Sequence, residues 1–321
     1  MKKRSLGYIS IFLSLVLYLA GLPFFLEPSI AVTDAHIEIR PSKVGSKATY
    51  RFIFSVDQTW EIHDDIVLIW PPGTNIDPPI PREANAKKQR LTQIIESISI
   101  GLIPCNACQG LPVIEKLKDR SIRMIIKSHV AIDPTIPGYN PVVITVPDSC
   151  GFTNPTRKGT YTYYVATESE PKTTACEPVE IVESRIGEPE GIPSVVVDPN
   201  TTSLPASYTI TFRVGRGGWL RKGIGMIKLI FPEGTKIPTP GLISPMHITV
   251  NGVPLFRSPN GVGQNLNFPV PVEIENSGQV IIQIDQAAGI INPESASDYW
   301  IEVATSSDSL WVPSEPYSIG D

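Results

Sequence analysis

Four cysteines are the residues of this sequence with the clearest capacity for chemistry: Cys105, Cys108, Cys150 and Cys176. An even number of cysteines favours disulfides in a protein that works outside the cytoplasm. The C-x-x-C spacing of Cys105 and Cys108 also fits half of a structural zinc site, although such sites usually have a second close pair of ligands. Disulfides, a zinc site and free thiols therefore all stay open, and we expect disulfides.

The expected strand order narrows the disulfide pairing. If strands alternate in direction, the segments that end near Cys105 and Cys150 lie at one pole of a domain, and Cys176 lies at the other. A strand of about seven residues spans roughly 23 Å, which is far more than the distance between the Cα atoms of a disulfide. We therefore predict that Cys150 bonds Cys105 or Cys108, and that no bridge joins Cys150 to Cys176.

Motifs for catalysis are missing from the sequence. Its four histidines, His36, His63, His129 and His247, do not stand at ligand spacing on any one predicted strand. Neither H-E-x-x-H nor G-x-S-x-G occurs, and no nucleophile is placed beside a general base. The sequence therefore predicts a protein that is not an enzyme and that needs no cofactor.

Tryptophans give a second kind of candidate site, because their flat rings can stack on sugars or fill a protein contact. Trp60 and Trp219 stand at matching places in an internal repeat, and we expect both to cap a core. Trp70 is also expected in a core. Trp300 and Trp311 remain, and we expect them to face outward as candidate contacts for a glycan or a protein partner.

The internal repeat defines the elements that must position these residues. Residues 140–181 align without a gap on residues 278–319, and both stretches contain an Asn-Pro pair followed by an aromatic strand. The chain is therefore predicted to be two copies of one module. The first copy covers 33–184 and the second copy covers 190–321, with a joining segment at 185–189. Each copy has the usual size of a domain.

Hydrophobic periodicity predicts strands in both copies. In the stretch ATYRFIFSV, the side chains of Tyr50, Phe52 and Phe54 alternate with others, as in a strand with one buried face. About seven short strands per copy predict an all-β chain of two tandem antiparallel β-sandwiches with an immunoglobulin-like (Ig-like) pattern. Tyr161 stands where the tyrosine corner of such a domain bonds back to the backbone.

Two local signals depart from this plain strand pattern. Residues 86–98 have helical spacing, and they belong to extra residues that the first copy carries between about 81 and 120. The pair Asn251-Gly252 stands between apolar residues, as a two-residue type I′ hairpin turn requires. We therefore expect the copies to differ mainly in the extra segment of the first copy.

The N-terminal segment predicts export. It begins with a basic stretch, continues with apolar residues at 6–26 and ends in the small-x-small site Ser29-Ile30-Ala31. Residues 1–31 are therefore expected to be a signal peptide, and an uncleaved membrane anchor is the alternative. Either way, the two copies are expected to be secreted or displayed at the cell surface.

Charge argues against some classes of partner. The formal net charge is −5 at pH 7, and a mildly acidic chain lacks the basic surface with which proteins bind nucleic acid or anionic lipid. We therefore expect no nucleic-acid partner, and no membrane contact beyond the N-terminal signal or anchor.

Several stretches of the second copy resemble a known family. LIFPEGTKIP, ITVNGVPL, AAGIINP, YWIEVATSSD and SEPYSI are similar to the Ig-like repeats of secreted and S-layer-associated surface proteins of Gram-positive, often thermophilic, bacteria. The resemblance covers nearly all of 190–321 and, more loosely, 33–184. It implies spacing, display or adhesion outside the cell, and it carries no catalytic residues.

Together these patterns predict a non-catalytic secreted or cell-surface protein with a structural or interaction role. The expected partners are copies of itself or other cell-envelope proteins, and the first strand, near residues 35–41, is a candidate for pairing with the edge of a neighbouring sheet. The alternative is an extracellular carbohydrate-binding module that holds a cell-wall glycan at Trp300 or Trp311.

Overall fold

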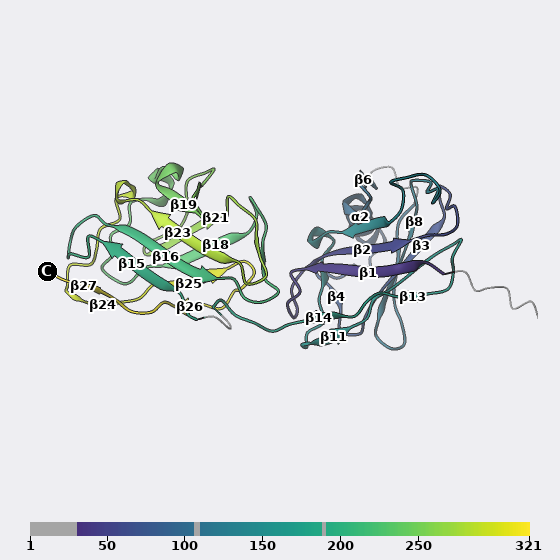
Figure 1. Ribbon diagram of the computed structural model, residues 1–321, viewed down its shortest axis with the longest axis horizontal. Coiled ribbons are helices and arrows are strands. Elements are labelled where there is room, and N and C mark those ends of the chain that lie inside the picture. Colours follow the sequence, from purple (N-terminus) through teal and green to yellow (C-terminus); the bar gives the residue numbers. More distant parts are fainter. Residues whose placement is uncertain (1–30, 106–109, 188–190) are drawn as a thin grey trace, which may run out of the picture.

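The computed structural model describes residues 31–105, 110–187 and 191–321. The named strands of this part form antiparallel ladders throughout, so the all-β class is confirmed. Figure 1 shows the two copies as two bodies placed end to end along the longest axis. Apart from Ala31, the expected signal peptide lies outside the described residues. In the part that is described, no helix is long and apolar enough to cross a membrane.

The first copy is a sandwich of two five-stranded sheets, of orders β1-β2-β9-β5-β6 and β13-β12-β3-β8-β7. The strands of the first sheet are β1 (Thr33–Arg40), β2 (Thr49–Ser55), β9 (Val142–Val146), β5 (Ser99–Ile100) and β6 (Ile103–Pro104). Those of the second are β13 (Thr174–Ala175), β12 (Tyr164–Thr167), β3 (Asp65–Trp70), β8 (Ile122–Lys127) and β7 (Val113–Lys116). Two further pairs are β4 (Asn75–Ile76) with β10 (Phe152–Thr153), and β11 (Gly159–Tyr161) with β14 (Val179–Ile181).

The second copy repeats this arrangement with sheets of orders β15-β16-β23-β19-β20 and β21-β18-β25-β26. The first sheet contains β15 (Ser194–Asp198), β16 (Ser207–Arg213), β23 (Gln279–Ile284), β19 (Ile248–Val250) and β20 (Val253–Pro254). The second contains β21 (Asn265–Pro269), β18 (Met226–Ile230), β25 (Glu302–Thr305) and β26 (Val312–Pro313). The remaining pairs are β17 (Trp219–Leu220) with β22 (Ile274–Glu275), and β24 (Ser297–Tyr299) with β27 (Tyr317–Ile319).

The predicted local signals are confirmed. The helix of the first copy is α2 (Ala84–Ser97), whose buried side chains include Ile94 and Ile95. The turn at Asn251 and Gly252 joins β19 to β20, and both residues have positive φ, as a type I′ turn requires. Short 3₁₀ turns complete the structure: η1 (Asp148–Cys150), η2 (Pro240–Leu242), η3 (Pro245–His247) and η4 (Gln286–Ala288).

The buried apolar side chains form two clusters, one drawn from residues 32–181 and the other from residues 186–319. The first strand, β1, pairs with β2 of its own sheet. Its side chains Ile37 and Ile39 lie in the first cluster, 6% and 8% exposed. Burying these two isoleucines stabilises the strand in place, so β1 belongs to its own core and is also an edge strand of its sheet.

A buried tyrosine–asparagine contact recurs in both copies and explains the repeated Asn-Pro motif. The Tyr50 hydroxyl donates to Asn154 Oδ1 at 2.8 Å, and Asn154 Nδ2 donates to the carbonyl oxygens of Pro41 and Lys43 at 2.7 and 2.8 Å. Burial raises the pKa of Tyr50 well above its usual value, so the phenol stays protonated and remains a donor. We call this set of bonds the asparagine clamp.

The second copy builds the same asparagine clamp with different loop residues. Tyr208 donates to Asn292 Oδ1 at 2.6 Å, and Asn292 Nδ2 donates to the carbonyl oxygens of Pro199 and Thr201 at 2.9 and 2.8 Å. In each copy the clamp joins a central strand, the loop after the first strand and the segment that follows the 3₁₀ turn.

The predicted tyrosine corner at Tyr161 is confirmed, because its hydroxyl donates to the carbonyl of Arg157 at 2.8 Å. Tyr299 makes the same bond to the carbonyl of Ser295 at 2.8 Å. The second copy thus forms the corner without the glycine that precedes it in the first copy.

Replacing the clamp asparagine tests how much it stabilises a copy. We expect Asn292→Ala to lower the free energy of unfolding by about 3 kcal/mol, since three hydrogen bonds are lost and their buried partners stay unsatisfied. Tyr208→Phe removes one of those bonds and should cost about 1 kcal/mol. Chemical denaturation of both variants checks the order, and equal losses would contradict the proposed role of Asn292.

Candidate functional site at the junction of the two copies

The backbone of the first copy contacts a loop of the second copy directly. Ser42, in the loop between β1 and β2, donates its N–H to the carbonyl of Gly217 at 2.9 Å. The Ser184 hydroxyl, just after β14, donates to the carbonyl of Arg216 at 2.5 Å. Two separate segments of the first copy therefore hold one loop of the second copy, residues 214–218.

Glycines allow this close approach. A Cβ atom on Gly217 would lie 2.7 Å from both Ser42 Oγ and a methyl carbon of Val182, and its φ is +70°. A Cβ atom on Gly215 would lie 2.7 Å from Ser184 Oγ. The first copy has the residues D-Q-T before Trp60 where the second copy has G-R-G-G before Trp219. The glycine loop is thus a feature of the junction and not of the module.

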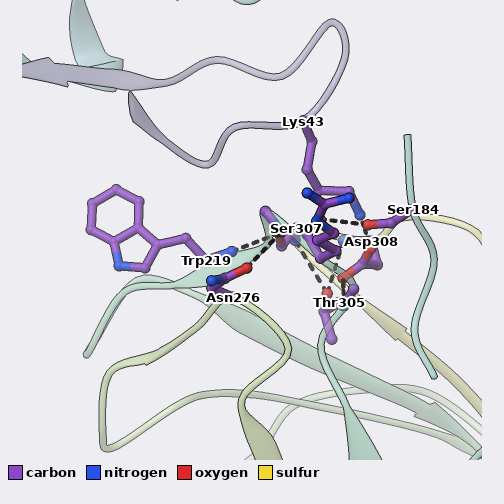
Figure 2. A network of polar contacts seen from close by, with 10 residues as sticks. Lys43, Ser184, Trp219, Asn276, Thr305, Ser307 and Asp308 are labelled. Carbon is purple, nitrogen blue, oxygen red and sulfur yellow. Dashed lines mark hydrogen bonds and ion pairs between the residues drawn. The ribbon is translucent and has the colours of Figure 1, made fainter. Parts of the chain in front are cut away.

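A buried ion pair joins the two copies at the centre of this contact. The Lys43 ammonium of the first copy meets the Asp308 carboxylate of the second, and the two residues are 6% and 5% exposed. Figure 2 shows Lys43 reaching down from its loop onto Asp308, with Ser184 and Thr305 beside the pair. Burying two charges is favourable only when each has a partner, so these two residues lock each other in place.

The fold of the second copy holds Asp308 ready for this pair. Asp308 donates its backbone N–H to Thr305 Oγ1 at 2.9 Å, and its Oδ2 accepts the N–H of Gly215 at 3.3 Å. Glu170 occupies the same repeat position in the first copy, where its Oε1 accepts the N–H of Asp57 at 2.7 Å. In each module the carboxylate therefore accepts a hydrogen bond from a loop of its own fold. In the second copy it also pairs with Lys43 across the junction.

Exposed ion pairs near the buried one also cross from one copy to the other. Arg40 pairs with Glu275 at 2.9 Å and lies 4.0 Å from Glu273, Asp148 pairs with Arg221 at 3.4 Å, and Glu180 pairs with Arg216. All of these side chains are more than a third exposed, so each pair stabilises the junction only weakly. Their complementary signs mainly fix how one copy is oriented against the other.

Sequence reasoning did not find this junction. Two signals were present: the glycine run at 215–218 has no counterpart in the first copy, and Lys43 aligns with Thr201. A junction residue differs between copies because only one of them faces a partner. The positions at which the two copies differ, and not the motifs that they share, therefore indicate where the copies contact each other.

The prediction that Cys150 bonds Cys105 or Cys108 is wrong. Cys150 is a free, buried thiol, and its Sγ donates to the carbonyl of Ile94 at 3.5 Å. Helix α2 causes the difference, because Arg90 Nη2 donates to the Cys150 carbonyl at 2.7 Å and holds the helix against η1.

The other cysteines also depart from the expected disulfide framework. Cys176 is a free, buried thiol, and no bond joins it or Cys150 to Cys105. Cys105 Sγ lies 3.1 Å from His129 Nδ1, whereas Cys108 lies outside the described residues. In the described part of the chain, no group of three or more histidine, cysteine or acidic side chains is placed to hold a metal ion.

The tryptophans lie where the sequence predicted, except for Trp219. Trp60 and Trp70 are fully buried in the first core, as expected. Trp300 and Trp311 face outward, 54% and 41% exposed, and their role as contacts stays a prediction. Trp219 does not cap the second core: it is partly buried and lies at the junction, where its backbone N–H donates to Ser307 Oγ at 2.9 Å.

No protein-family model matches this sequence, and no curated protein matches it. Solved structures are similar to it at low identity. The D0-D1 domain of intimin is 9% identical, with a TM-score of 0.22, over 90% of this chain and 99% of its own. The C-terminal domain of the Streptococcus pyogenes antigen I/II-family protein AspA is 10% identical over the same shares, with a TM-score of 0.26.

A partial N-terminal region of an enterococcal surface protein is 8% identical over 94% of this chain and 99% of its own, with a TM-score of 0.24. TM-scores this low assign no function to the chain. None of the three names refers to an S-layer or to a thermophilic organism, so that part of the sequence resemblance stays a prediction.

Removing the lysine of the buried ion pair tests the junction. We expect Lys43→Met to lower the free energy of unfolding by about 3 kcal/mol, because it leaves the Asp308 carboxylate buried without its cation. Lys47→Met is the matched control, since Lys47 lies on the same loop and its ion pair with Asp77 is solvent-exposed. Denaturant unfolding that gives equal losses for the two variants would show that the pair does not stabilise the junction.

Thiol chemistry tests the corrected cysteine assignment. Burial raises the pKa of Cys150 and of Cys176 to about 12. Both groups should stay as unreactive thiols at pH 8 in the folded protein and react with iodoacetamide only after unfolding. Their contribution to stability is complete below pH 9 or so and declines as the pH rises toward about 12. Peptide mapping by mass spectrometry would refute this if it found either cysteine in a disulfide.

Proposed function

We propose that the chain is a non-catalytic interaction protein, secreted or held at the cell surface, in which residues 33–184 and 190–321 are two β-sandwich domains joined as one rigid unit. The observation that supports this most is the buried pair of Lys43 and Asp308. The two charges come from different domains, so any other orientation of the domains would separate them and leave each without its partner, which is unfavourable for buried charges. The export signal expected at 1–31 supports the location.

A rigid unit of this kind suits presentation of surfaces to a partner. The partners proposed here are copies of the chain or other proteins of the cell envelope. Association would use the edges of the sheets, and β1 is itself an edge strand that pairs with β2 on one side only. One such edge is β7, a strand of four residues in which Val113 is 54% exposed. An S-layer or another envelope assembly remains the finer form of this proposal.

Small-angle X-ray scattering tests the rigid unit. We expect wild-type residues 32–321 to fit a single elongated shape, and we expect Asp308→Ala to give a broader distribution of sizes because the junction opens. Lys47→Met again serves as the control that leaves the junction closed. A wild-type protein whose scattering needs many interdomain orientations would overturn the proposal.

Light scattering and surface labelling test the interaction role. Association at high protein concentration that is weakened by Val113→Lys at the β7 edge would support pairing through that edge.

Surface labelling of intact cells, with a cytoplasmic protein as control, tests the location. A chain that stays inside the labelled cells would refute both the location and the proposed partners.

A further inference from the structure

Trp219 does not occupy the core position that its repeat counterpart, Trp60, occupies in the first copy. Trp60 is fully buried, and its indole N–H bonds Ser128 Oγ at 2.8 Å and the Val130 carbonyl at 2.7 Å. In the second copy the preceding loop is one residue longer, and Leu220, which is fully buried, belongs to the core. The core of the second copy therefore does not require Trp219, and the indole is available for another task.

Trp219 lies between two hollows formed jointly by the two copies. One, of about 370 Å³, is lined by Trp219 with Lys47, Asp148 and Arg221. The other, of about 240 Å³, is lined by Trp219 with Arg40 and Asn276. Ligand sites occur preferentially at the interfaces of domains, and the larger hollow lies within their usual volume. We call the two hollows with their shared indole the Trp219 crevice.

The indole is held in one orientation. Its N–H donates to Glu273 Oε1 at 2.9 Å, and the Arg221 guanidinium carbon lies 5.9 Å from the ring centroid. In Figure 2 the ring points away from Ser307, to which its own backbone is bonded, and away from the Lys43–Asp308 pair. A side chain fixed in this way loses little entropy when a ligand binds against it.

The charged side chains that line the Trp219 crevice are already in ion pairs. Arg221 pairs with Asp148 at 3.4 Å, Arg40 with Glu275 at 2.9 Å, and Lys47 with Asp77 at 2.9 Å. An ionic ligand would therefore find no free charge of opposite sign in these pairs. Guanidinium and carboxylate groups in pairs still keep spare donors and acceptors, and these suit a neutral ligand that has many hydroxyl groups.

We infer that the Trp219 crevice binds a neutral saccharide. A sugar ring combines an apolar face, which can pack on the indole, with hydroxyl groups that both donate and accept hydrogen bonds. The crevice offers both kinds of contact at a fixed spacing. This inference rests on the proposed function, because the crevice exists only while the junction is closed. It places the saccharide contact at Trp219 and not at Trp300 or Trp311.

The test measures binding of residues 32–321 to an array of neutral cell-wall and host oligosaccharides, followed by titration of the saccharide retained best. We expect Trp219→Ala to weaken that binding at least about 10-fold, as truncation of an aromatic anchor commonly does. Trp219→Phe should lose less, because it keeps a smaller ring. Trp300→Ala and Trp311→Ala are matched controls, and both should bind like the wild type.

Scattering on each variant separates this inference from the proposed function. If Trp219→Ala keeps the junction closed and loses binding, the inference is supported. If no saccharide on the array is retained, or if Trp219→Ala binds as well as the wild type, the inference is wrong while the rigid unit stands. If Asp308→Ala opens the junction and saccharide binding persists, the crevice is not the site.

Discussion

The asparagine clamp is the interaction on which the rest of the structure depends. Asn154 holds the carbonyl oxygens of Pro41 and Lys43, and so it fixes the loop that follows the first strand. That loop carries Lys43 to Asp308 and places the Ser42 backbone against Gly217. A bond that looks internal to one module therefore also determines how the two modules meet. The Trp219 crevice, in turn, exists only because they meet in this orientation.

The duplication shows which parts of a module are required by its fold and which were altered at the contact. The clamp, the tyrosine corner and the carboxylate at the position of Glu170 and Asp308 occur in both copies, so the sandwich itself needs them. Lys43 and the glycine run at 215–218 occur in one copy each. Both contact the other copy directly. The buried Lys43 ammonium, for example, would be unfavourable without the Asp308 carboxylate.

Local patterns of the sequence were sufficient for much of the fold. Alternation in β2, helical spacing at 86–98 and the Asn251-Gly252 turn depend on neighbours a few residues away, and all were predicted correctly. Cys150 was not, because its environment is determined by a helix that packs on it from about 60 residues earlier in the chain. Trp219 was misplaced because one added residue in a loop moved the adjacent leucine into the core instead. The repeat alignment matched residue types but could not show which of two neighbours fills the interior.

The exit of the first copy has a mechanical consequence. Val182, just after β14, runs parallel to the segment around Lys43: the Val44 N–H bonds the Val182 carbonyl, and the Val182 N–H bonds the Ser42 carbonyl. When a chain is pulled at its two ends, strands paired in parallel at entry and exit are loaded in shear, so their bonds must break together and not one after another. The second copy has a parallel bridge at the same place, between Thr201 and Gly320. In both modules, tension along the chain would therefore load these hydrogen bonds in shear.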